Sequence, residues 1–266
     1  MRRRRVLVIP EYNEARTIID VLSASEPSVD QIVVINDGSE DESAELVIAW
    51  ARDLPHVTLI NLPANGGKSG AMLCGFAYCY RCMEQGALSP DDLIITIDAD
   101  GQHEPEEIPK ACDYLERHGL DIVLGRRTLK GYPWYKHIGN WGLSLWASLL
   151  SGYRYHDVEC GFRVMRAAVL PDLLSYYCGR KYSGDQEIGI ITAAVGFKVD
   201  NRFPVGILYY RAGARIRDGL TNLVMGLMVA LRVWLGRRMN QKQRVEAVLR
   251  RVEIVQPYTL NSGAGD

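Results

Sequence analysis

The sequence has no apolar run long enough to cross a lipid bilayer. Its most apolar late segment, Leu220–Leu235, is interrupted by Asn222 and Arg232 and falls short of the roughly 20 residues that a spanning helix needs. Near the start of the chain, only Val6–Ile9 separates a run of arginines from Pro10, which is too short for the apolar core of a signal peptide. We therefore expect a cytoplasmic protein whose late segment lies on a membrane surface or packs against the domain.

An excess of charge of one sign is also lacking. The 266 residues carry a formal net charge of −1, so nothing favours nucleic acid as a partner. Basic residues still gather at the start of the chain and in a late stretch with few acids: Arg211, Arg215, Arg217, Arg232, Arg237, Arg238, Lys242, Arg244, Arg250 and Arg251. Each one alone is best interpreted as a solvated surface residue, but together they could face anionic lipid or a phosphorylated acceptor.

Cysteine is sparse and forms no obvious framework. Of the six cysteines, only Cys79 and Cys82 form a CxxC, and no second pair completes a metal or redox site. Both fall in an apolar helical run, where a spacing of three places them on one face. Core packing in a reducing compartment is the favoured interpretation.

What the first half does contain is a regular alternation of apolar strands and helices. Strands are predicted at Val6–Ile9, Gln31–Ile35, Val57–Ile60 and Leu93–Ile97, and helices at Glu14–Ser25, from Glu42, and at Lys68–Glu84. Strands that are apolar throughout, separated by helices, predict an α/β fold with a mostly parallel central sheet and helices on both faces. Such sheets bind ligands at the carboxyl ends of their strands, and the polar motifs of this sequence lie there.

The second half is less regular. The predicted elements are an aromatic-rich helix at Trp134–Leu150, a strand near Cys160–Met165, a helix near Asp185–Val195, two short strands around Pro204, and an amphipathic helix near Ile216–Leu235. No internal repeat or clear linker divides the chain, so one domain is expected over residues 1–240. Residues 241–266 are predicted to form a polar, frayed tail.

The strongest chemical signal is Asp98-Ala99-Asp100, directly after the strand Leu93–Ile97. Two carboxylates that flank one residue at a strand end can both reach a hard divalent ion. Mg²⁺ and Mn²⁺ prefer oxygen ligands and often keep substrate phosphates in their shell, and such an ion would neutralise a leaving diphosphate. Taken alone, the pair could equally cap the following helix, because Glu104-Pro105-Glu106 has the composition of a helix start.

The loops after the first three strands carry further polar motifs: Pro10-Glu11-Tyr12-Asn13-Glu14, Asp37-Gly38-Ser39-x-Asp41 and Asn65-Gly66-Gly67-Lys68. Tyr12 can stack on a nucleotide base, and Asp37 can accept a hydrogen bond from a base. Backbone amides at Gly66 and Gly67, together with Lys68, can take phosphate oxygens. Each motif alone is an ordinary turn or cap, but four motifs on successive strands favour one composite site.

With these motifs the chain resembles the family 2 glycosyltransferases of the GT-A fold, and among them the dolichyl-phosphate mannose synthase-like branch of polyprenyl-phosphate glycosyltransferases. The other segments that carry the resemblance are Asn36-Asp37-Gly38-Ser39, Gln102-His103, Gly125-Arg126-Arg127 and Asp157-x-x-Cys160-Gly161-Phe162-Arg163. The sequence departs from the family pattern at Asn36, Ser69 and Arg126, where aspartate, glycine and a small residue are common. It also lacks the spanning C-terminal helices of many members.

The resemblance implies roles for individual residues. A nucleotide-sugar donor, linked to UDP or GDP, would be surrounded by Pro10, Tyr12, Asn13, Glu14, Asp37, Gly38, Lys68, Asp98, Ala99, Asp100 and Gln102. Asp98 and Asp100 would hold Mg²⁺ or Mn²⁺, and the catalytic set would be Asp100, Glu187, Arg127 and Arg163, with both arginines on phosphate or acceptor. Residues 1–100 would form the nucleotide-binding half, and residues 101–240 the sugar and acceptor half.

The implied reaction is a single displacement that inverts the anomeric centre. A polyprenyl-phosphate acceptor is already anionic, whereas a hydroxyl acceptor needs Glu187 or Asp185 to take its proton. The aromatic helix and Leu220–Leu235 could provide a lipid-facing surface and a peripheral membrane contact, or could pack in the core. The alternatives are a soluble glycan or small-molecule acceptor, a nucleotidyltransferase, or a nucleotide-sugar-binding protein without activity. A dinucleotide-dependent dehydrogenase is disfavoured, because no GxGxxG follows the first strand.

Overall fold

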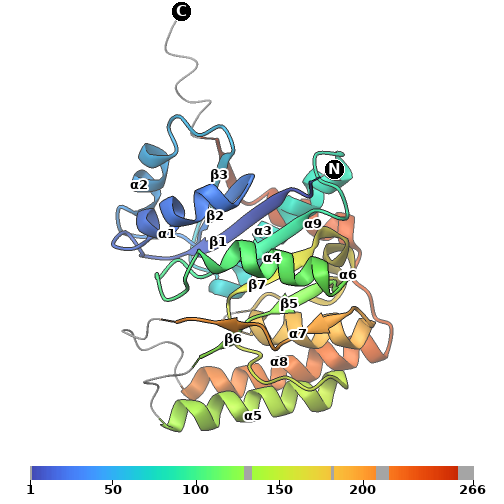
Figure 1. Cartoon of the computed structure of the whole chain (residues 1–266). Coiled ribbons are helices and arrows are strands. Elements are labelled where there is room, and N and C mark those ends of the chain that lie inside the picture. Colours follow the sequence, from blue (N-terminus) through green and yellow to red (C-terminus); the bar gives the residue numbers. More distant parts are fainter. Residues whose placement is uncertain (1, 129–133, 181–182, 208–215, 257–266) are drawn as a thin grey trace, which may run out of the picture.

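The computed structural model describes residues 2–128, 134–180, 183–207 and 216–256. Within these residues the centre is an eight-stranded sheet with the order β10-β3-β2-β1-β4-β7-β5-β8 (Figure 1). Its strands are β1 (Arg5–Glu11), β2 (Gln31–Asn36), β3 (Val57–Asn61), β4 (Leu93–Thr96), β5 (Ile122–Leu124), β7 (Arg163–Arg166), β8 (Val199–Asp200) and β10 (Glu253–Val255). Strands β1 to β4 run parallel, while β7 and β10 are antiparallel to their neighbours.

Helices cover both faces of this sheet (Figure 1). One core packs α1 (Ile18–Ser25), α2 (Ser43–Trp50) and α4 (Glu107–Arg117) against the sheet, and the other packs α3 (Lys68–Glu84), α6 (Leu170–Tyr176), α7 (Gly184–Val195) and α9 (Gln241–Leu249). In β1, Leu7 and Ile9 belong to the first core, and Val6 and Val8 to the second. Burial that alternates between two covered faces confirms the predicted α/β class.

Helices α5 (Trp134–Ser151) and α8 (Ile216–Trp234) lie side by side at the edge of the molecule, beyond α7 (Figure 1). The exposed large apolar side chains here are Ile138, Trp141, Leu145 and Leu149 on α5, and Val224, Leu227, Met228, Leu231, Trp234 and Leu235 on and just after α8. Spacings of three and four residues place each set along one side of its helix. We term this surface the apolar face. In the described part of the chain, no helix combines the length and apolarity needed to cross a membrane.

The second half of the chain differs in places from the elements predicted for it. The side chains of Trp134 and Tyr135, together with Arg211 and Arg215, lie outside the described residues. Of the two short strands expected around Pro204, β8 precedes this residue and β9 (Pro204–Val205) contains it. β9 pairs with β6 (Arg126–Arg127) in a separate two-stranded sheet. The strand predicted at Cys160–Met165 begins only at Arg163, because the backbone before it is drawn toward Thr96, whose hydroxyl donates to Gly161 O at 2.8 Å.

The first helix also begins later than its pattern indicates. Residues from Glu14 form a turn, in which Glu14 O accepts from both Thr17 N and Ile18 N, so α1 begins at Ile18. By contrast, α3 spans Lys68–Glu84 as predicted.

Cys79 on α3 is buried in the hydrophobic core, and the six cysteines are free thiols. The CxxC motif is therefore core packing, as expected.

The prediction of a polar tail after residue 240 is wrong for residues 241–255. Asn240 caps α9 by accepting a hydrogen bond from Gln243 N at 3.1 Å, and Val245 and Leu249 are buried in the core beside α3. The chain then adds β10 to the free edge of β3. The apolar pair at a spacing of four residues was the available signal for this helix, but a three-residue edge strand leaves almost no sequence pattern.

Candidate active site

Asp98 follows the carboxyl end of β4 and contacts two basic side chains. Lys68 Nζ, at the first position of α3, lies 2.6 Å from Asp98 Oδ1, and His103 Nε2 lies 3.5 Å from Asp98 Oδ2. Burial opposes ionisation of this carboxyl, but Lys68 and His103 outweigh it and hold the pKa of Asp98 well below its usual range. Asp98 is therefore a fixed negative charge at the strand end.

Asp100 is the second carboxylate at this edge. Its Oδ1 accepts from Gln102 N at 3.0 Å, and its Oδ2 accepts from Gln102 Nε2 at 2.7 Å. Burial, and then the negative charge of Asp98, raise the pKa of Asp100. A divalent cation between two such carboxylates would relieve both effects, so the pair fits Mg²⁺ or Mn²⁺. The described residues hold no cluster of three or more acidic, histidine or cysteine ligands, so the other ligands would come from substrate phosphate and water.

A buried network of ion pairs continues from Asp98 into the protein. Lys68 Nζ also lies 2.9 Å from Asp185 Oδ2, and Arg163 Nη1 lies 2.6 Å from Asp185 Oδ1. Burial opposes ionisation of Asp185, but the two cations hold its pKa below the usual range. We term Asp98, Lys68, Asp185 and Arg163 the charge chain. It joins the end of β4 to the first residues of α3, α7 and β7.

Arg163 was predicted to meet phosphate or acceptor, and the structure places it deeper than that. Its side chain is fully buried, with Nη2 donating to Val158 O at 3.3 Å. Arg163 is linked to Lys68 through Asp185, which contacts both side chains. Sequence spacing could not show this, because the Arg163–Asp185 pair spans two elements that meet only in the fold.

Asp37, which was predicted to accept a hydrogen bond from a base, already has partners within the protein. Its carboxylate is buried and accepts from Gly66 N and Gly67 N, both at 2.8 Å. The two glycine amides that were expected to take phosphate oxygens are thus already engaged, and Asp37 ties the loop after β2 to the loop before α3. Gly38 has a φ of +71°, and a Cβ there would lie 2.8 Å from the carbonyl carbon of Ala64. This close approach requires glycine.

The loop after β1 is fastened to the loop after β2. Asn13 N donates to Ser39 Oγ at 3.0 Å, Asn13 Oδ1 accepts from Glu40 N at 2.8 Å, and Glu14 N donates to Ser43 Oγ at 3.0 Å. Asn13 adopts a φ of 55°, a conformation that asparagine tolerates better than most residues. The loops after β1 and β2, both predicted to contact the nucleotide-sugar, therefore lie together, and Asn13 connects them.

Pro10, Tyr12 and Ala99 are the remaining residues that were predicted to surround the nucleotide-sugar donor. Pro10 is buried in β1 opposite Ile35, and the buried Ala99 accepts a hydrogen bond through its carbonyl from Thr17 Oγ1 at 2.9 Å. Tyr12 is the exposed member, with 39% of its surface accessible. Its ring is thus open to stacking, as predicted.

Glu11 is a site residue that sequence reasoning missed, although it lies inside the first polar motif. It is buried, its Oε2 accepts from Ser39 Oγ at 3.0 Å, and its Oε1 has no partner among the described residues. Burial raises the pKa of Glu11 to about 7, with smaller contributions from the charges of Asp41 and Glu14. An unpartnered carboxyl oxygen beside Tyr12 can accept a hydrogen bond from a ligand hydroxyl or N–H.

Arg127, which was predicted to meet phosphate or acceptor, makes a bidentate pair with Asp157. Its Nε and Nη2 donate to the two carboxylate oxygens of Asp157, each at 2.8 Å, and Nη2 also reaches Asn140 Oδ1 at 3.3 Å. Asp157 is buried and Arg127 half-buried. The pair ties β6 to the segment before β7 and to α5.

Glu187 is the predicted residue that the structure places furthest from its expected role. Its side chain is fully buried, with Oε1 accepting from Ser183 Oγ and Oε2 from Cys178 N. Burial raises the pKa of Glu187, although these hydrogen bonds oppose the rise. The carboxylate holds the loop between α6 and α7 instead of facing Asp98. Asp185, two residues earlier, is the residue of this helix that belongs to the charge chain.

Solved structures with a similar fold include glucosyl-3-phosphoglycerate synthase from Mycobacterium tuberculosis in complex with UDP. The match has a TM-score of 0.61 and 18% identity, and covers 86% of this chain and 80% of that one. The same enzyme with Mn²⁺ and UDP-glucose matches with a TM-score of 0.57 over 88% of this chain and 79% of that one. At this level of identity the likeness concerns the fold alone: the architecture is that of the GT-A glycosyltransferases.

A model described as glycosyl transferase family 2 matches residues 6–170. The chain therefore belongs to the family 2 glycosyltransferases. Similar proteins include a UDP-N-acetylglucosamine–dolichyl-phosphate N-acetylglucosaminyltransferase from Methanococcus voltae, 30% identical over 70% of this chain and 78% of that protein. An undecaprenyl-phosphate mannosyltransferase from Micrococcus luteus is 28% identical over 62% of this chain and 68% of that protein. The predicted resemblance to the polyprenyl-phosphate branch is confirmed.

Proposed function

We propose that this glycosyltransferase moves a sugar from a nucleoside-diphosphate donor to a polyprenyl phosphate at a membrane surface, with inversion and with Mg²⁺ or Mn²⁺. The observation that carries the proposal is the Asp98/Asp100 pair at the end of β4, with Lys68 at 2.6 Å and an exposed apolar face on the same chain. The relatives named for transfer to dolichyl and undecaprenyl phosphate support the acceptor class.

The donor would lie across the carboxyl ends of β1, β2 and β4. The base would stack on Tyr12, and a ribose hydroxyl or base N–H would donate to the unpartnered Oε1 of Glu11. Asp37 would shape this pocket through Gly66 and Gly67 rather than touch the base. Uridine and guanosine both satisfy these contacts, so the choice of base is left to the experiment below.

Asp98 and Asp100 would hold the divalent cation, which would supply charge neutralisation for the departing nucleoside diphosphate. Lys68 stays protonated beside the diphosphate, since Asp185 and Asp98 raise its pKa against the effect of burial. Lys68 would therefore add a second positive charge next to the leaving group without any proton transfer. Asp185 would hold Lys68 in position through their ion pair, and Arg163 would hold Asp185 in turn.

A phosphate acceptor fits the engagement of the two carboxylates, Glu187 and Asp185, that were considered as general bases. Both oxygens of Glu187 are engaged inside the protein, and Asp185 is paired with two cations. A phosphate oxygen is already anionic near neutral pH, so it can attack the anomeric carbon from the face opposite the diphosphate without losing a proton to the enzyme. A hydroxyl acceptor would need a base that neither carboxylate provides in this state.

The apolar face would bring the enzyme to its lipid acceptor. Trp141 is 65% exposed, and Trp234 and Leu149 are similarly open. An amphipathic helix pair with tryptophans and a basic flank is typical of proteins that lie in the membrane interface. We propose peripheral contact at the cytoplasmic face, through α5 and α8.

The test is release of nucleoside diphosphate from a panel of UDP- and GDP-sugars, with Mn²⁺, Mg²⁺ or EDTA, and with or without a short-chain polyprenyl phosphate. We expect release that requires metal, rises strongly with the lipid, and is lost in Asp100→Asn. Asp113→Asn, on the exposed side of α4, is the matched control and should behave as wild type. Metal-dependent release with a soluble acceptor alone would move the acceptor to another class, and binding of no nucleotide-sugar would overturn the proposal.

A further inference from the structure

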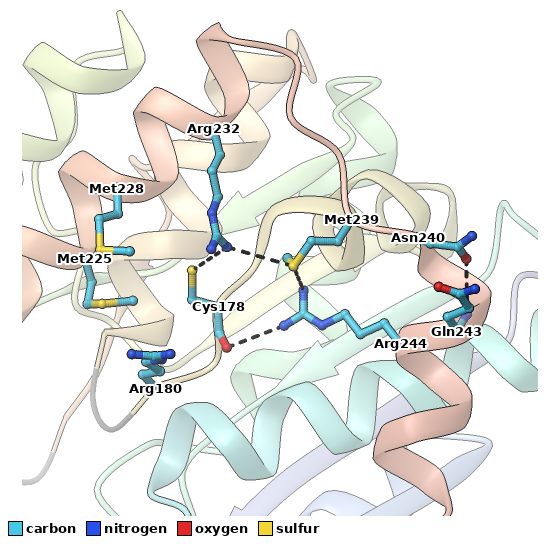
Figure 2. Close-up of a pocket in the computed structure, with 9 residues that line it drawn as sticks. All are labelled: Cys178, Arg180, Met225, Met228, Arg232, Met239, Asn240, Gln243 and Arg244. Carbon is cyan, nitrogen blue, oxygen red and sulfur yellow. Dashed lines mark hydrogen bonds between the residues drawn. The ribbon is translucent and has the colours of Figure 1, made fainter.

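A second cationic site lies away from the charge chain, in a cavity of about 420 Å³. Its walls come from three segments: α8, the loop after α6, and α9 with the chain that leads into it (Figure 2). Three arginines and three methionines dominate the lining: Arg180, Arg232, Arg244, Met225, Met228 and Met239. None of these residues belongs to the donor site or the charge chain.

The arginines of this cavity face neutral partners. Arg232 Nη1 approaches Cys178 Sγ at 3.1 Å, and Arg244 donates to Cys178 O at 3.4 Å (Figure 2). Arg244 also donates to Leu174 O at 2.8 Å. Among the described residues, no carboxylate oxygen lies within 4 Å of the guanidinium groups of Arg180, Arg232 or Arg244. Neighbouring arginines behave differently: Arg238 pairs with Asp172 at 2.8 Å.

Within the described part of the chain, the three arginines therefore lack a negative charge that balances their positive charges. Burial lowers the pKa of Arg244, while the charges of Cys178, Glu187 and Tyr177 oppose this effect. The positive charge of Arg232 adds a smaller lowering. Glu187, the acid that acts on Arg244, has its oxygens engaged by Ser183 and Cys178. An anion in the cavity would offset the repulsion between the arginines and satisfy their open donors.

The other walls indicate what the anion is attached to. Met225, Met228 and Arg232 follow one another along α8 at spacings of three and four residues, so methionines and arginine share one side of the helix. Met228 and its neighbour Leu231 are also part of the apolar face. The cavity is thus continuous with the surface proposed to contact the bilayer, and thioether side chains adapt well to an irregular apolar group.

We propose that this cavity binds the phosphate of an anionic phospholipid, with the arginines on the phosphate oxygens and the methionines against the glycerol and first acyl carbons. The lipid is a ligand distinct from the sugar acceptor, and it would fix the depth and orientation of α8 at the membrane. The choice of lipid over free phosphate rests on the membrane contact proposed above, whereas binding of the phosphate group does not depend on sugar transfer.

Calorimetry with water-soluble dihexanoyl lipids tests this directly in the full chain, without donor or acceptor. We expect saturable binding of dihexanoyl phosphatidic acid, with much weaker binding of dihexanoyl phosphatidylcholine and of inorganic phosphate. Arg232→Gln and Arg180→Gln should each weaken phosphatidic acid binding roughly tenfold, the loss expected for one charge-assisted hydrogen bond. Arg180 is exposed and its guanidinium makes no hydrogen bond to the described residues, so its substitution is safe for folding.

Arg237→Gln is the matched control, because Arg237 is an exposed arginine between α8 and α9 outside the cavity. It should leave binding within about twofold of wild type, since an exposed charge outside the cavity contributes little. An equal loss in Arg237→Gln would overturn the site in favour of diffuse attraction. Equal affinity for inorganic phosphate and phosphatidic acid would overturn the lipid assignment. Failure of sugar transfer with intact lipid binding would count against the proposed function alone.

Discussion

The carboxylate of Asp98 lies directly against the backbone of Gly161. A Cβ at residue 161 would be 2.4 Å from Asp98 Oδ2 and 2.6 Å from Oδ1, which is far inside van der Waals contact. The absence of a side chain at Gly161 is therefore what lets Asp98 reach Lys68 and the end of β4.

Gly161→Ala should displace Asp98 and abolish most sugar transfer. A shift of about 1 Å in a catalytic group commonly costs about a hundredfold in rate, and overpacking costs roughly 1–3 kcal/mol of stability. Steady-state transfer and thermal unfolding measure the two effects. Gly142→Ala in α5, where a Cβ meets nothing within 4 Å, is the control and should be stable and active. Full activity in a folded Gly161→Ala protein would show that the position of Asp98 is not critical.

Glu11→Gln should stabilise the free enzyme more at pH 8 than at pH 5. Burial raises the pKa of Glu11 from 4.5 to about 7, so the native state holds this proton more tightly than the unfolded state. Stability then falls as the pH rises from about 4.5 to about 7, by up to roughly 3 kcal/mol, and stays low above that range. Glutamine cannot ionise and avoids this loss. Unfolding temperatures of both proteins at the two pH values test the point, and an equal difference at both would refute it.

Arg127→Ala should destabilise the fold strongly, because it leaves the buried carboxylate of Asp157 without its cation. Removing one partner of a buried ion pair lowers the free energy of unfolding by about 3–5 kcal/mol. The loss here should not exceed this range, because the Arg127 side chain is 17% exposed and solvent screens the pair. Arg250→Ala breaks the surface pair with Glu246 and should cost less than about 0.5 kcal/mol. Urea unfolding of both variants makes the comparison. Similar losses in the two would mean that Asp157 finds another partner or water.

Ser69→Ala should weaken the junction between α3 and α7. Ser69 Oγ accepts from Gly184 N at 2.7 Å, and Ser69 O accepts from the buried Tyr177 hydroxyl at 3.1 Å. Loss of the hydroxyl leaves a buried N–H without an acceptor, which costs about 1–3 kcal/mol, and loosens the turn that carries Asp185. We expect lower stability and lower turnover together. Ser23→Ala, which removes an exposed acceptor for Trp50 Nε1, is the control for stability and should change it by less than about 0.5 kcal/mol.

The sequence predicted the frame of the site well, because that frame follows from local patterns. A short stretch of sequence is enough to predict each of the four apolar strands, the helix that begins at Lys68 and the acidic residues after β4. The parallel pairing of the strands then brings their carboxyl ends together. The left-handed φ of 84° at Gly67 explains why α3 begins where it does. The CxxC motif could also be interpreted from its apolar surroundings alone.

Side-chain partners were harder to predict, since they depend on contacts distant in sequence. Asp185 and Glu187 are separated by about 200° around α7, so only one of them can point toward Lys68, and the sequence does not say which. Asp37 was expected to meet a base, yet the glycine amides that it binds lie across a loop whose closure appears only in the fold. Arg127 and Asp157 are joined in the same way.

The last strand, β10, has a consequence for how the chain folds during synthesis. It pairs with β3 far back in the sequence: Asn61 Nδ2 donates to Glu253 Oε2, 192 residues later, at 3.2 Å. Until residues 253–255 leave the ribosome, the edge of β3 presents open backbone donors and acceptors, a template for pairing between nascent chains. Pairing of this edge of the sheet thus waits for residues 253–255, and shielding of the edge by chaperones should raise the yield of folded enzyme.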